Sequence, residues 1–518
     1  MPIIDFFDRG WASSPDAVAY CTDDESWTYD EARELSCRIG HALLDEGLQR
    51  EGKVAVLSPN APLAWICVLG VWRAGGAWVP LNPGNPAHEN ADLLRRFDVE
   101  VLFYDPALAD QVEEFVRQGL DLRLVALRPA ADVTVLEDWL GGRPSYPPVV
   151  VGQQMDDVVA ISPTGGTTGV PKGVMNTHRS FSVMVVHQML ALAYTEDEHP
   201  VNLAAAPMTH TAGLFSLQTS ARGGTVVVVP RATPEHILPA IEKHGVTELF
   251  LPPTVIYRLL DVLADRVVDT SSLKYVMYAA APMSSRKLRA GIERLGPVFI
   301  ECYGQVEAPA AITFMRPEEH LRDGVVADDD RLSSCGRPYP LVRVAIKDPD
   351  EGTVLAPGET GEICVQGDLV MKGYYRDPER TAETIRDGWL HTGDLGRLDE
   401  DGYLHLTDRK KDMIITGGFN VYPGEVEQVI WSLPEVEDCA VVGAPDADWG
   451  ERVTAVVELK PGRSLDEDAV VAHCRSSLSG VKTPKQIVFV DQLPRSANGK
   501  VLKRDVRQRF WAAADRAI

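Results

Sequence analysis

The segment ISPTGGTTGVPKGV, residues 161–174, is the most informative stretch of this sequence. Residues 158–162, which lead into this segment, predict a buried strand that runs into a loop rich in glycine and threonine. The backbone amides and hydroxyls of such a loop, with the charge of Lys172, suit a phosphate-bearing anion. The segment contains no GxxxxGK[ST] or GxGxxG pattern, so it is neither a Walker A loop nor a dinucleotide fingerprint. A phosphate loop explains this composition better than the alternative, a flexible surface loop.

Apolar runs alternate with helix-like stretches on both sides of this segment. Strands are predicted at residues 53–57, 101–104, 203–206, 225–229, 248–251 and 275–279. Such alternation is typical of parallel sheets covered by helices. The most apolar stretch, 61–79, is interrupted by Arg73 and falls short of the ~20 residues that span a bilayer. We therefore expect a buried helix and strand there, and no transmembrane segment.

The pattern changes toward the C-terminus. From about residue 335 to 403, short apolar runs separated by turn sequences such as DPDEG and APGETG predict antiparallel strands. The polar run DRKKD, 408–412, then precedes a small α/β unit, and we place a domain boundary near Lys411. In this unit we expect helices at 424–433 and 465–478, and strands at 439–442, 453–459 and 487–490.

Length and composition describe a globular protein of two or more domains, with 518 residues, 45% hydrophobic and 24% charged. The net charge of -24 disfavours nucleic acid and anionic lipid as partners, although a compact nucleotide can still bind through short-range contacts. The eight cysteines are scattered, without a CxxC pair or histidines at metal-ligand spacing, which indicates reduced, buried thiols. MPIIDFFDRG lacks an export signal, so we expect a cytoplasmic protein.

The stretch TGGTTGVPKG resembles the phosphate-loop signature of the adenylate-forming superfamily, which includes acyl-CoA synthetases, adenylation domains of peptide synthetases and luciferases. Four further motifs follow in the order of that family: YGQVE (303–307), HTGD (391–394), DRKKDMIITGGFNVYPGEVE (408–427) and PRSANGK (494–500). Together they span nearly the whole chain. The resemblance implies an N-terminal adenylation domain, 1–408, of two doubly wound α/β subdomains and a small β-barrel. It also implies a small mobile α+β C-terminal domain, 412–518, with the hinge at Lys411.

The resemblance also implies a nucleotide site. Its residues would be Thr164, Gly165, Gly166, Thr167, Thr168, Gly169 and Lys172 at the phosphates, Tyr303 at the adenine, Asp394 and Arg409 at the ribose, and Glu307 at Mg²⁺. A tyrosine ring and a hard carboxylate oxygen suit those roles. Two positions depart from the family pattern, which usually has Ser at Gly165 and Thr at Val306. Both departures remove a hydroxyl from the predicted phosphate contacts, and neither removes a charge.

Catalysis and domain motion are assigned in the same way. Lys500 occupies the place of the essential adenylation lysine of the family, where an ammonium would neutralise the carboxylate and the α-phosphate as they combine. Lys411 would be the hinge, and Gly417 and Gly418 would approach the pantetheine tunnel. The alternatives are a solvated surface charge for Lys500, an ordinary linker residue for Lys411 and a simple turn for Gly417 and Gly418.

The resemblance also implies which residues line the acyl pocket, because their positions match the substrate loops of the family. They are His210, Ala279, Ala280, Ala281, Gly304 and Val306. Relatives often have Gly in place of Ala279, so the added methyl would trim the cavity and favour an aromatic or short to medium-chain acid. His210 would lie beside the carboxylate or gate the pocket; a capping or core-edge histidine is the alternative.

The implied reaction is ATP-dependent activation of a carboxylic acid to an acyl-adenylate, followed by transfer to coenzyme A, with ATP, Mg²⁺ and coenzyme A required. Three alternatives stay open: an amide synthetase that uses an amine, a domain that loads a carrier protein, and a silent binding module. The silent alternative is disfavoured because the charged residues of the motifs are retained. The identity of the acid stays open, and so does assembly as a homodimer.

Overall fold

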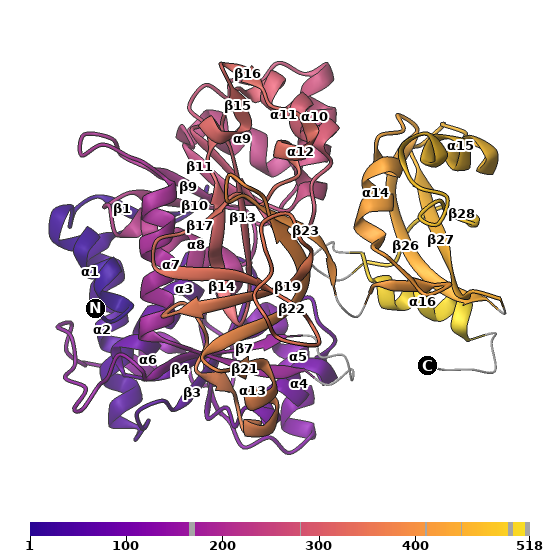
Figure 1. Ribbon diagram of the computed structural model, residues 1–518. Coiled ribbons are helices and arrows are strands. Elements are labelled where there is room, and N and C mark those ends of the chain that lie inside the picture. Colours follow the sequence, from indigo (N-terminus) through magenta and orange to yellow (C-terminus); the bar gives the residue numbers. More distant parts are fainter. Residues whose placement is uncertain (165–170, 280, 410–411, 447, 496–500, 513–518) are drawn as a thin grey trace.

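The computed structural model describes residues 1–164, 171–279, 281–409, 412–446, 448–495 and 501–512 (Figure 1). Two large mixed sheets with their helices make up most of the molecule. The residues after β23 form a further sheet with its own helices, on the right of the view in Figure 1. This arrangement is the α/β fold predicted from the sequence.

The seven-stranded sheet contains the strand that leads into the glycine- and threonine-rich segment. Its spatial order is β20 (Gly373–Tyr374), β8 (Lys172–Thr177), β7 (Val158–Thr164), β4 (Ala77–Pro80), β3 (Lys53–Leu57), β5 (Val101–Tyr104), β6 (Arg123–Ala126). Strands β7, β4, β3, β5 and β6 are parallel, whereas β8 and β20 are antiparallel to their neighbours. The helices of this part are α2 (Tyr29–Asp45), α3 (Pro62–Arg73), α4 (Ala87–Arg96), α5 (Ala109–Arg117) and α6 (Leu136–Leu140).

The nine-stranded sheet has a parallel centre and antiparallel edges. Its order is β17 (Arg337–Pro338), β14 (Ala308–Met315), β13 (Phe299–Gln305), β12 (Tyr275–Tyr278), β11 (Glu248–Leu251), β9 (Val201–Ala204), β10 (Thr225–Val228), β1 (Val18–Cys21), β2 (Ser26–Thr28). Strand β14 is antiparallel to both of its neighbours, β13 and β17, and β2 is antiparallel to β1. The helices are α1 (Ile4–Ser13), α7 (His178–Ala191), α8 (Gly213–Ser220), α9 (Pro234–His244), α10 (Pro253–Asp265), α11 (Ser285–Leu295) and α12 (Asp329–Leu332).

Helix α3 lies in the interior, as predicted for the apolar stretch 61–79. Every one of its residues is buried, and a helix that is apolar on all sides is typically enclosed by the protein. Its Trp65 and Trp72 rings pack edge-on against Trp78 of β4, with centroids 5.8 and 6.4 Å apart. The core cluster around them includes residues of both large sheets. Among the described residues, no helix has the length and apolar character needed to cross a membrane.

A five-stranded antiparallel sheet follows at residues 342–409 and is the small β unit expected after residue 335. It consists of β18 (Val342–Lys347), β19 (Gly361–Gly367), β22 (Trp389–Leu398), β21 (Ile385–Arg386) and β23 (Leu404–Arg409). Helix α13 (Pro378–Thr384) contacts β21 and β22 of this sheet. The hairpin of β15 (Leu321–Arg322) and β16 (Val325–Val326) lies instead near α11, where Leu321 and Val326 pack against the core of the nine-stranded sheet (Figure 1).

The C-terminal part has a mixed sheet of five strands: β25 (Phe419–Val421), β24 (Ile414–Thr416), β27 (Gly450–Leu459), β26 (Val436–Asp446) and β28 (Gln486–Val490). Its helices are α14 (Pro423–Trp431), α15 (Glu467–Ser477) and α16 (Lys503–Trp511). Within the described parts of the chain, these strands pair only with one another.

The strands lie within a few residues of their predicted positions. Not every strand, however, runs parallel to its neighbours. The alternation of apolar runs predicted parallel sheets, whereas β8 returns antiparallel to β7, with Thr164 opposite Lys172. Alternation locates strands but carries no signal for a hairpin whose turn is rich in glycine. All eight cysteines are free and buried, as predicted.

Candidate active site

Tyr303 and Asp394 come from different sheets and meet side chain to side chain. Tyr303 lies on β13 and is 7% exposed; its hydroxyl donates to Asp394 Oδ2 at 2.8 Å. Burial, together with the neighbouring carboxylate, raises the pKa of Tyr303 well above its ordinary value, so the phenol stays a donor. A second hydrogen bond joins the same two segments: Gln305 Nε2 donates to the Thr392 carbonyl at 3.3 Å. Arg409, the last residue of β23, is the backbone ladder partner of Asp394.

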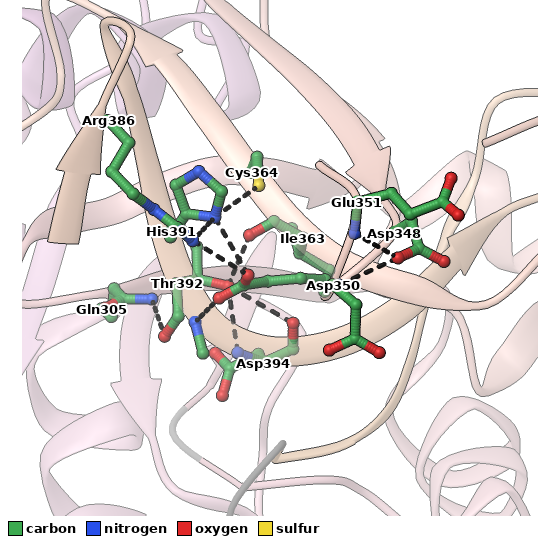
Figure 2. Close-up of polar contacts among 12 residues, drawn as sticks. Gln305, Asp348, Asp350, Glu351, Ile363, Cys364, Arg386, His391, Thr392 and Asp394 are labelled. Atoms are coloured by element: carbon green, nitrogen blue, oxygen red, sulfur yellow. Dashed lines mark hydrogen bonds and ion pairs between the residues drawn. The ribbon is translucent and has the colours of Figure 1, made fainter. Parts of the chain in front are cut away.

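The stretch of β22 that carries Asp394 is fixed by hydrogen bonds to β19 (Figure 2). Thr392 Oγ1 donates to the Ile363 carbonyl at 2.7 Å and accepts from the Asp394 amide at 3.1 Å. Glu362, also on β19, accepts from the Gly393 amide at 3.2 Å. These contacts hold the carboxylate of Asp394 in place relative to Tyr303.

Glu362, Cys364 and His391 form a cluster of groups that can ligate metals, although their spacing in the sequence gave no sign of it. His391 Nδ1 lies 2.9 Å from Glu362 Oε2 and 3.4 Å from Cys364 Sγ. Arg386 Nη2 lies 2.6 Å from the same nitrogen, as Figure 2 shows. The guanidinium puts a positive charge where a cation would bind, so we interpret the cluster as a support for residues 391–394 of β22.

Glu307, Tyr374 and Lys172 form a second group. Glu307 is 8% exposed, and its Oε1 accepts from the Tyr374 hydroxyl at 2.8 Å. Lys172, the first residue of β8, has its ammonium 4.7 Å from the centre of the Tyr374 ring. The antiparallel pairing of β20 with β8 places Tyr374 opposite Val174 and so brings these residues together. The structure thus joins two of the predicted charged residues through a tyrosine that was not predicted.

The predicted phosphate segment is described only at its two ends. Thr164 ends β7 and Lys172 begins β8, and these two residues face each other in the ladder. Gly165, Gly166, Thr167, Thr168 and Gly169 lie outside the described residues.

Gly304 lies near the end of β13, and Val306 lies in the turn between β13 and β14. A Cβ at Gly304 would lie 2.6 Å from the Ala310 nitrogen, so the close approach of the two strands requires glycine. The Val306 carbonyl accepts from Asn176 Nδ2 at 3.3 Å, while its half-buried side chain packs against the core. The contact of Asn176 with this carbonyl does not depend on the side chain at position 306.

The predicted acyl positions lie at the ends of two parallel strands. His210 belongs to the turn 208–212 after β9, and its Nδ1 lies 2.8 Å from the Thr211 hydroxyl. Burial lowers the pKa of His210, which favours the neutral ring. Half-buried Ala279 follows β12, Ala281 is also half-buried, and Ala280 lies outside the described residues. The parallel order of β9, β11 and β12 places both loops at the same edge of the sheet.

Gly417 and Gly418 form the turn between β24 and β25. Their φ angles are +57° and +82°, which favour glycine. The Trp449 ring covers Gly417, where a Cβ would lie 2.3 Å from Trp449 Cε3. Around this turn Ile415, Phe419 and Trp449 are 53%, 58% and 52% exposed. Lys411 and Lys500, the predicted hinge and catalytic lysine, lie outside the described residues.

The residues that the sequence interpretation missed support the predicted ones. Tyr374 connects Glu307 with Lys172, Glu362 holds the backbone of β22 beside Asp394, and Trp449 covers Gly417. Each acts through a contact between segments distant in the sequence, for which spacing gives no signal. The glycines beside Tyr374 and Trp449, Gly373 and Gly450, begin β20 and β27 and have positive φ angles.

Comparisons with known proteins find relatives along most of the chain. Residues 7–375 match the family model of the AMP-binding enzyme, and residues 425–500 match that of the AMP-binding enzyme C-terminal domain. A medium/long-chain-fatty-acid–CoA ligase of Mycobacterium tuberculosis is 38% identical over 490 residues, which is 90% of this chain and 82% of that protein. A feruloyl-CoA synthase of an Amycolatopsis species is 36% identical over 499 residues, 96% of each chain.

Among solved structures, the amide bond synthetase McbA from Marinactinospora thermotolerans superposes with a TM-score of 0.88 at 32% identity, over 98% of this chain and all of that one. The shared fold runs through both the large sheets and the C-terminal sheet. The chain belongs to the AMP-binding enzymes of the adenylate-forming superfamily.

Proposed function

We propose that this protein is an ATP-dependent carboxylic acid–coenzyme A ligase that releases AMP. The observation that carries the proposal is the contact between Tyr303 and Asp394, next to the group of Glu307, Tyr374 and Lys172. It brings a ring face, an acceptor for two ribose hydroxyls and a cation for phosphate within one site. The relatives named as CoA ligases support the same reaction class.

The adenosine end of ATP would bind between β13 and β22. The Tyr303 ring stacks on adenine, and Asp394 accepts hydrogen bonds from the ribose hydroxyls. Its Oδ2 already accepts from Tyr303, so the carboxylate is oriented before ATP arrives. Arg409, on the strand beside Asp394, adds the second ribose contact.

Glu307 fits a Mg²⁺ that accompanies ATP. Mg²⁺ typically uses one or two protein carboxylates plus phosphate oxygens and water, and Glu307 is a buried carboxylate with one oxygen held by Tyr374. When bound, the ion would neutralise charge on the phosphates. Tyr374 keeps the carboxylate from turning away, and Lys172 adds a further positive charge on the same tyrosine.

In the first half-reaction a carboxylate oxygen of the acid attacks the α-phosphorus, and pyrophosphate leaves. Lys500 neutralises the charge that gathers there, and Thr164, Gly165, Gly166, Thr167, Thr168 and Gly169 hold the phosphates. Residues 1–408 and 412–518 then move relative to each other about Lys411. In the second half-reaction the turn of Gly417 and Gly418 replaces Lys500. The thiol of coenzyme A loses its proton and its sulfur bonds to the acyl carbon, while the bond from that carbon to the phosphate oxygen breaks and AMP leaves.

The acid would be aromatic or of short to medium chain length. The loops of His210 and Ala279 lie at one edge of the nine-stranded sheet, the usual place for a ligand in an α/β fold. A neutral His210 can accept or donate a hydrogen bond at the carboxylate without adding charge.

The eight free, buried cysteines support a cytoplasmic location.

An amide synthetase is the second candidate. The specific observation in its favour is the close structural likeness to an amide bond synthetase, together with the hydroxyls missing at Gly165 and Val306. In that case an amine would enter while Lys500 stays in place.

The test is pyrophosphate release across a panel of carboxylic acids, with and without coenzyme A and with a mixture of amines, followed by product mass. We expect acid-dependent pyrophosphate release and a thioester with coenzyme A. An amide formed while coenzyme A is ignored would favour the second candidate, and the absence of acid-dependent release with every acid would contradict both.

A further inference from the structure

Lys503, the first residue of α16, lies among carboxylates from three other parts of the chain. Its ammonium lies 2.9 Å from both carboxylate oxygens of Glu427 on α14, and 3.9 Å from Asp408 Oδ2 on β23. Asp412 attracts the same ammonium electrostatically. The side chains of Glu427 and Asp408 are 4% and 5% exposed, so salt and water screen these charges only weakly. The cluster joins α16, α14 and β23.

The ammonium of Lys503 stays charged in this position. Burial lowers the pKa of Lys503, but the carboxylates of Glu427 and Asp408 outweigh burial and raise the pKa above its ordinary value. Glu427 is held in turn, because its Oε1 accepts from the Val441 amide of β26 at 2.8 Å. The pair therefore has a fixed geometry, unlike an exposed ion pair, which usually contributes little.

Asp408 and Asp412 flank Lys411, the proposed hinge. Asp408 is also bonded to a residue beyond the hinge, because its Oδ2 accepts from the Gly424 amide of α14 at 2.8 Å. In Figure 1, α14 and α16 belong to the C-terminal part, whereas β23 belongs to the sheet before it. Lys503 therefore connects the two parts of the chain that move in the proposed reaction.

Lys503 also lies three positions after Lys500, the proposed catalytic lysine. Arg495 and Val501, one on each side of Lys500 in the sequence, pair in an antiparallel bridge. The two ends of the segment that contains Lys500 are thus fixed to each other. The ion pair of Lys503 with Glu427 attaches these ends to α14.

We propose that Lys503 is a positioning residue for the first half-reaction: its contacts with Glu427 and Asp408 hold the segment of Lys500 at a fixed place relative to the strand before the hinge. Rotation about Lys411 separates Asp408 from Lys503, so this contact must break before the second half-reaction. Lys503 acts through Lys500 and not on the reacting atoms. The inference rests on the proposed adenylation and domain movement.

The chain offers matched variants. Removing Lys503 alone would leave the buried carboxylate of Glu427 unpaired, which is strongly destabilising. The test variant is therefore Lys503→Met combined with Glu427→Gln, which removes both charges and keeps an acceptor for the Val441 amide. Lys503→Arg retains the charge. The control is Arg507→Met combined with Glu451→Gln, because this pair, 2.7 Å apart, also anchors α16 but joins it to β27 rather than to β23. Thermal unfolding checks that each variant is folded.

The first measurement separates the two half-reactions in single-turnover assays. A misplaced group can cost up to about 10²-fold in rate, so we expect the test variant to form adenylate slower on the order of tenfold. The KM for ATP should not change. Transfer to coenzyme A from acyl-adenylate supplied ready-made should keep its rate or become faster. Lys503→Arg and the control should match the unmodified protein.

A merely structural role would slow both half-reactions together. Equal slowing of the two in the test variant would therefore overturn the proposal, and so would an unchanged rate of adenylation. The same selective slowing in the control, or in Lys503→Arg, would also overturn it, because the effect would then not depend on the charge beside Asp408.

The second measurement is hydrogen exchange of the full chain without substrates. The Gly424 amide donates to Asp408, and the Leu502 amide, next to Lys503, donates to the Pro494 carbonyl at 2.8 Å. Both amides should exchange on the order of tenfold faster in the test variant, as expected when one hydrogen bond is weakened. The control should leave both rates unchanged. Unchanged exchange at either amide in the test variant would overturn the proposal.

The two measurements also separate this inference from the proposed function. An unmodified protein that forms no adenylate with any acid would contradict the proposed function. Faster exchange at both amides would then still support the placement of this segment by Lys503.

Discussion

The residues around Tyr303 and those around Gly417 belong to two regions built in different ways. Tyr303 and Glu307 are 7% and 8% exposed, and each is held by a side chain from a distant segment. Around Gly417, in contrast, Phe419 is 58% exposed and Trp449 is 52% exposed. The first region is organised before any ligand binds, whereas the second presents apolar groups that a ligand or another part of the chain can cover. This difference suits a division of labour between nucleotide binding and acyl transfer.

The strongest test of this comparison is Lys500→Ala. Loss of a positioned charge typically costs 10²–10³ in rate, so the variant should almost stop adenylate formation from acid and ATP. Transfer to coenzyme A from acyl-adenylate supplied ready-made should be spared, because the lysine serves only the first step. Single-turnover assays of each half-reaction measure this, and equal damage to both would contradict the role given to Lys500.

Lys411→Pro tests whether the second region must move. Proline fixes φ, and a misplaced turn typically costs about 10²-fold in rate. We expect thioester formation to fall by that order while pyrophosphate release from acid and ATP stays nearly intact. Unchanged steady-state thioester production would place the hinge elsewhere.

Gly417→Ala and Gly418→Ala distinguish the Trp449 contact from backbone strain. Both positions have positive φ, which costs an alanine ~1–2 kcal/mol. Only at Gly417 does the new methyl clash with Trp449, since nothing lies within 4 Å of a Cβ at Gly418. We expect thermal unfolding to show a larger loss of stability for Gly417→Ala, with about tenfold slower thioester formation and unchanged adenylation. Identical losses for the two variants would show that the ring contact is unimportant.

Tyr303→Phe tests the preorganised region. The change removes the donor to Asp394 but keeps the ring, so we expect the KM for ATP to rise roughly fivefold, corresponding to ~1 kcal/mol for one hydrogen bond. The KM for coenzyme A should not change. A shift in both constants would mean that the two regions are not independent.

Ala279→Gly should have the smallest effect. Removing one methyl from the proposed pocket is worth ~1 kcal/mol in discrimination between acids, so activity on bulkier acids should rise a few-fold relative to compact ones. The ratio of kcat/KM values for a short and a bulky acid measures it. Best activity of the unmodified protein on acids of long chain length would contradict a compact pocket.

The order of the helices and strands could be predicted because apolar runs and turn residues are local signals. Tyr303 and Asp394 could be assigned to one site from their motifs, and the structure places their oxygens 2.8 Å apart. Tyr374 could not, because only the pairing of β20 with β8 brings it to Glu307. The same holds for Glu362, Cys364 and His391, which meet because β19 and β22 are antiparallel partners. Contacts of this kind depend on register, which spacing along the chain does not encode.

The return of β8 alongside β7 has a consequence for how the phosphates would be attracted. A phosphate loop that opens directly into a helix benefits from the partial positive charge of the helix N-terminus. Here a strand follows instead, α7 begins only at His178, and sheets have small net dipoles. Beyond the amides of the loop itself, attraction then comes from full charges such as Lys172 and from divalent ions, and salt weakens the attraction of those charges that are exposed. The affinity of this protein for nucleotide should therefore depend more on ionic strength than that of a loop backed by a helix.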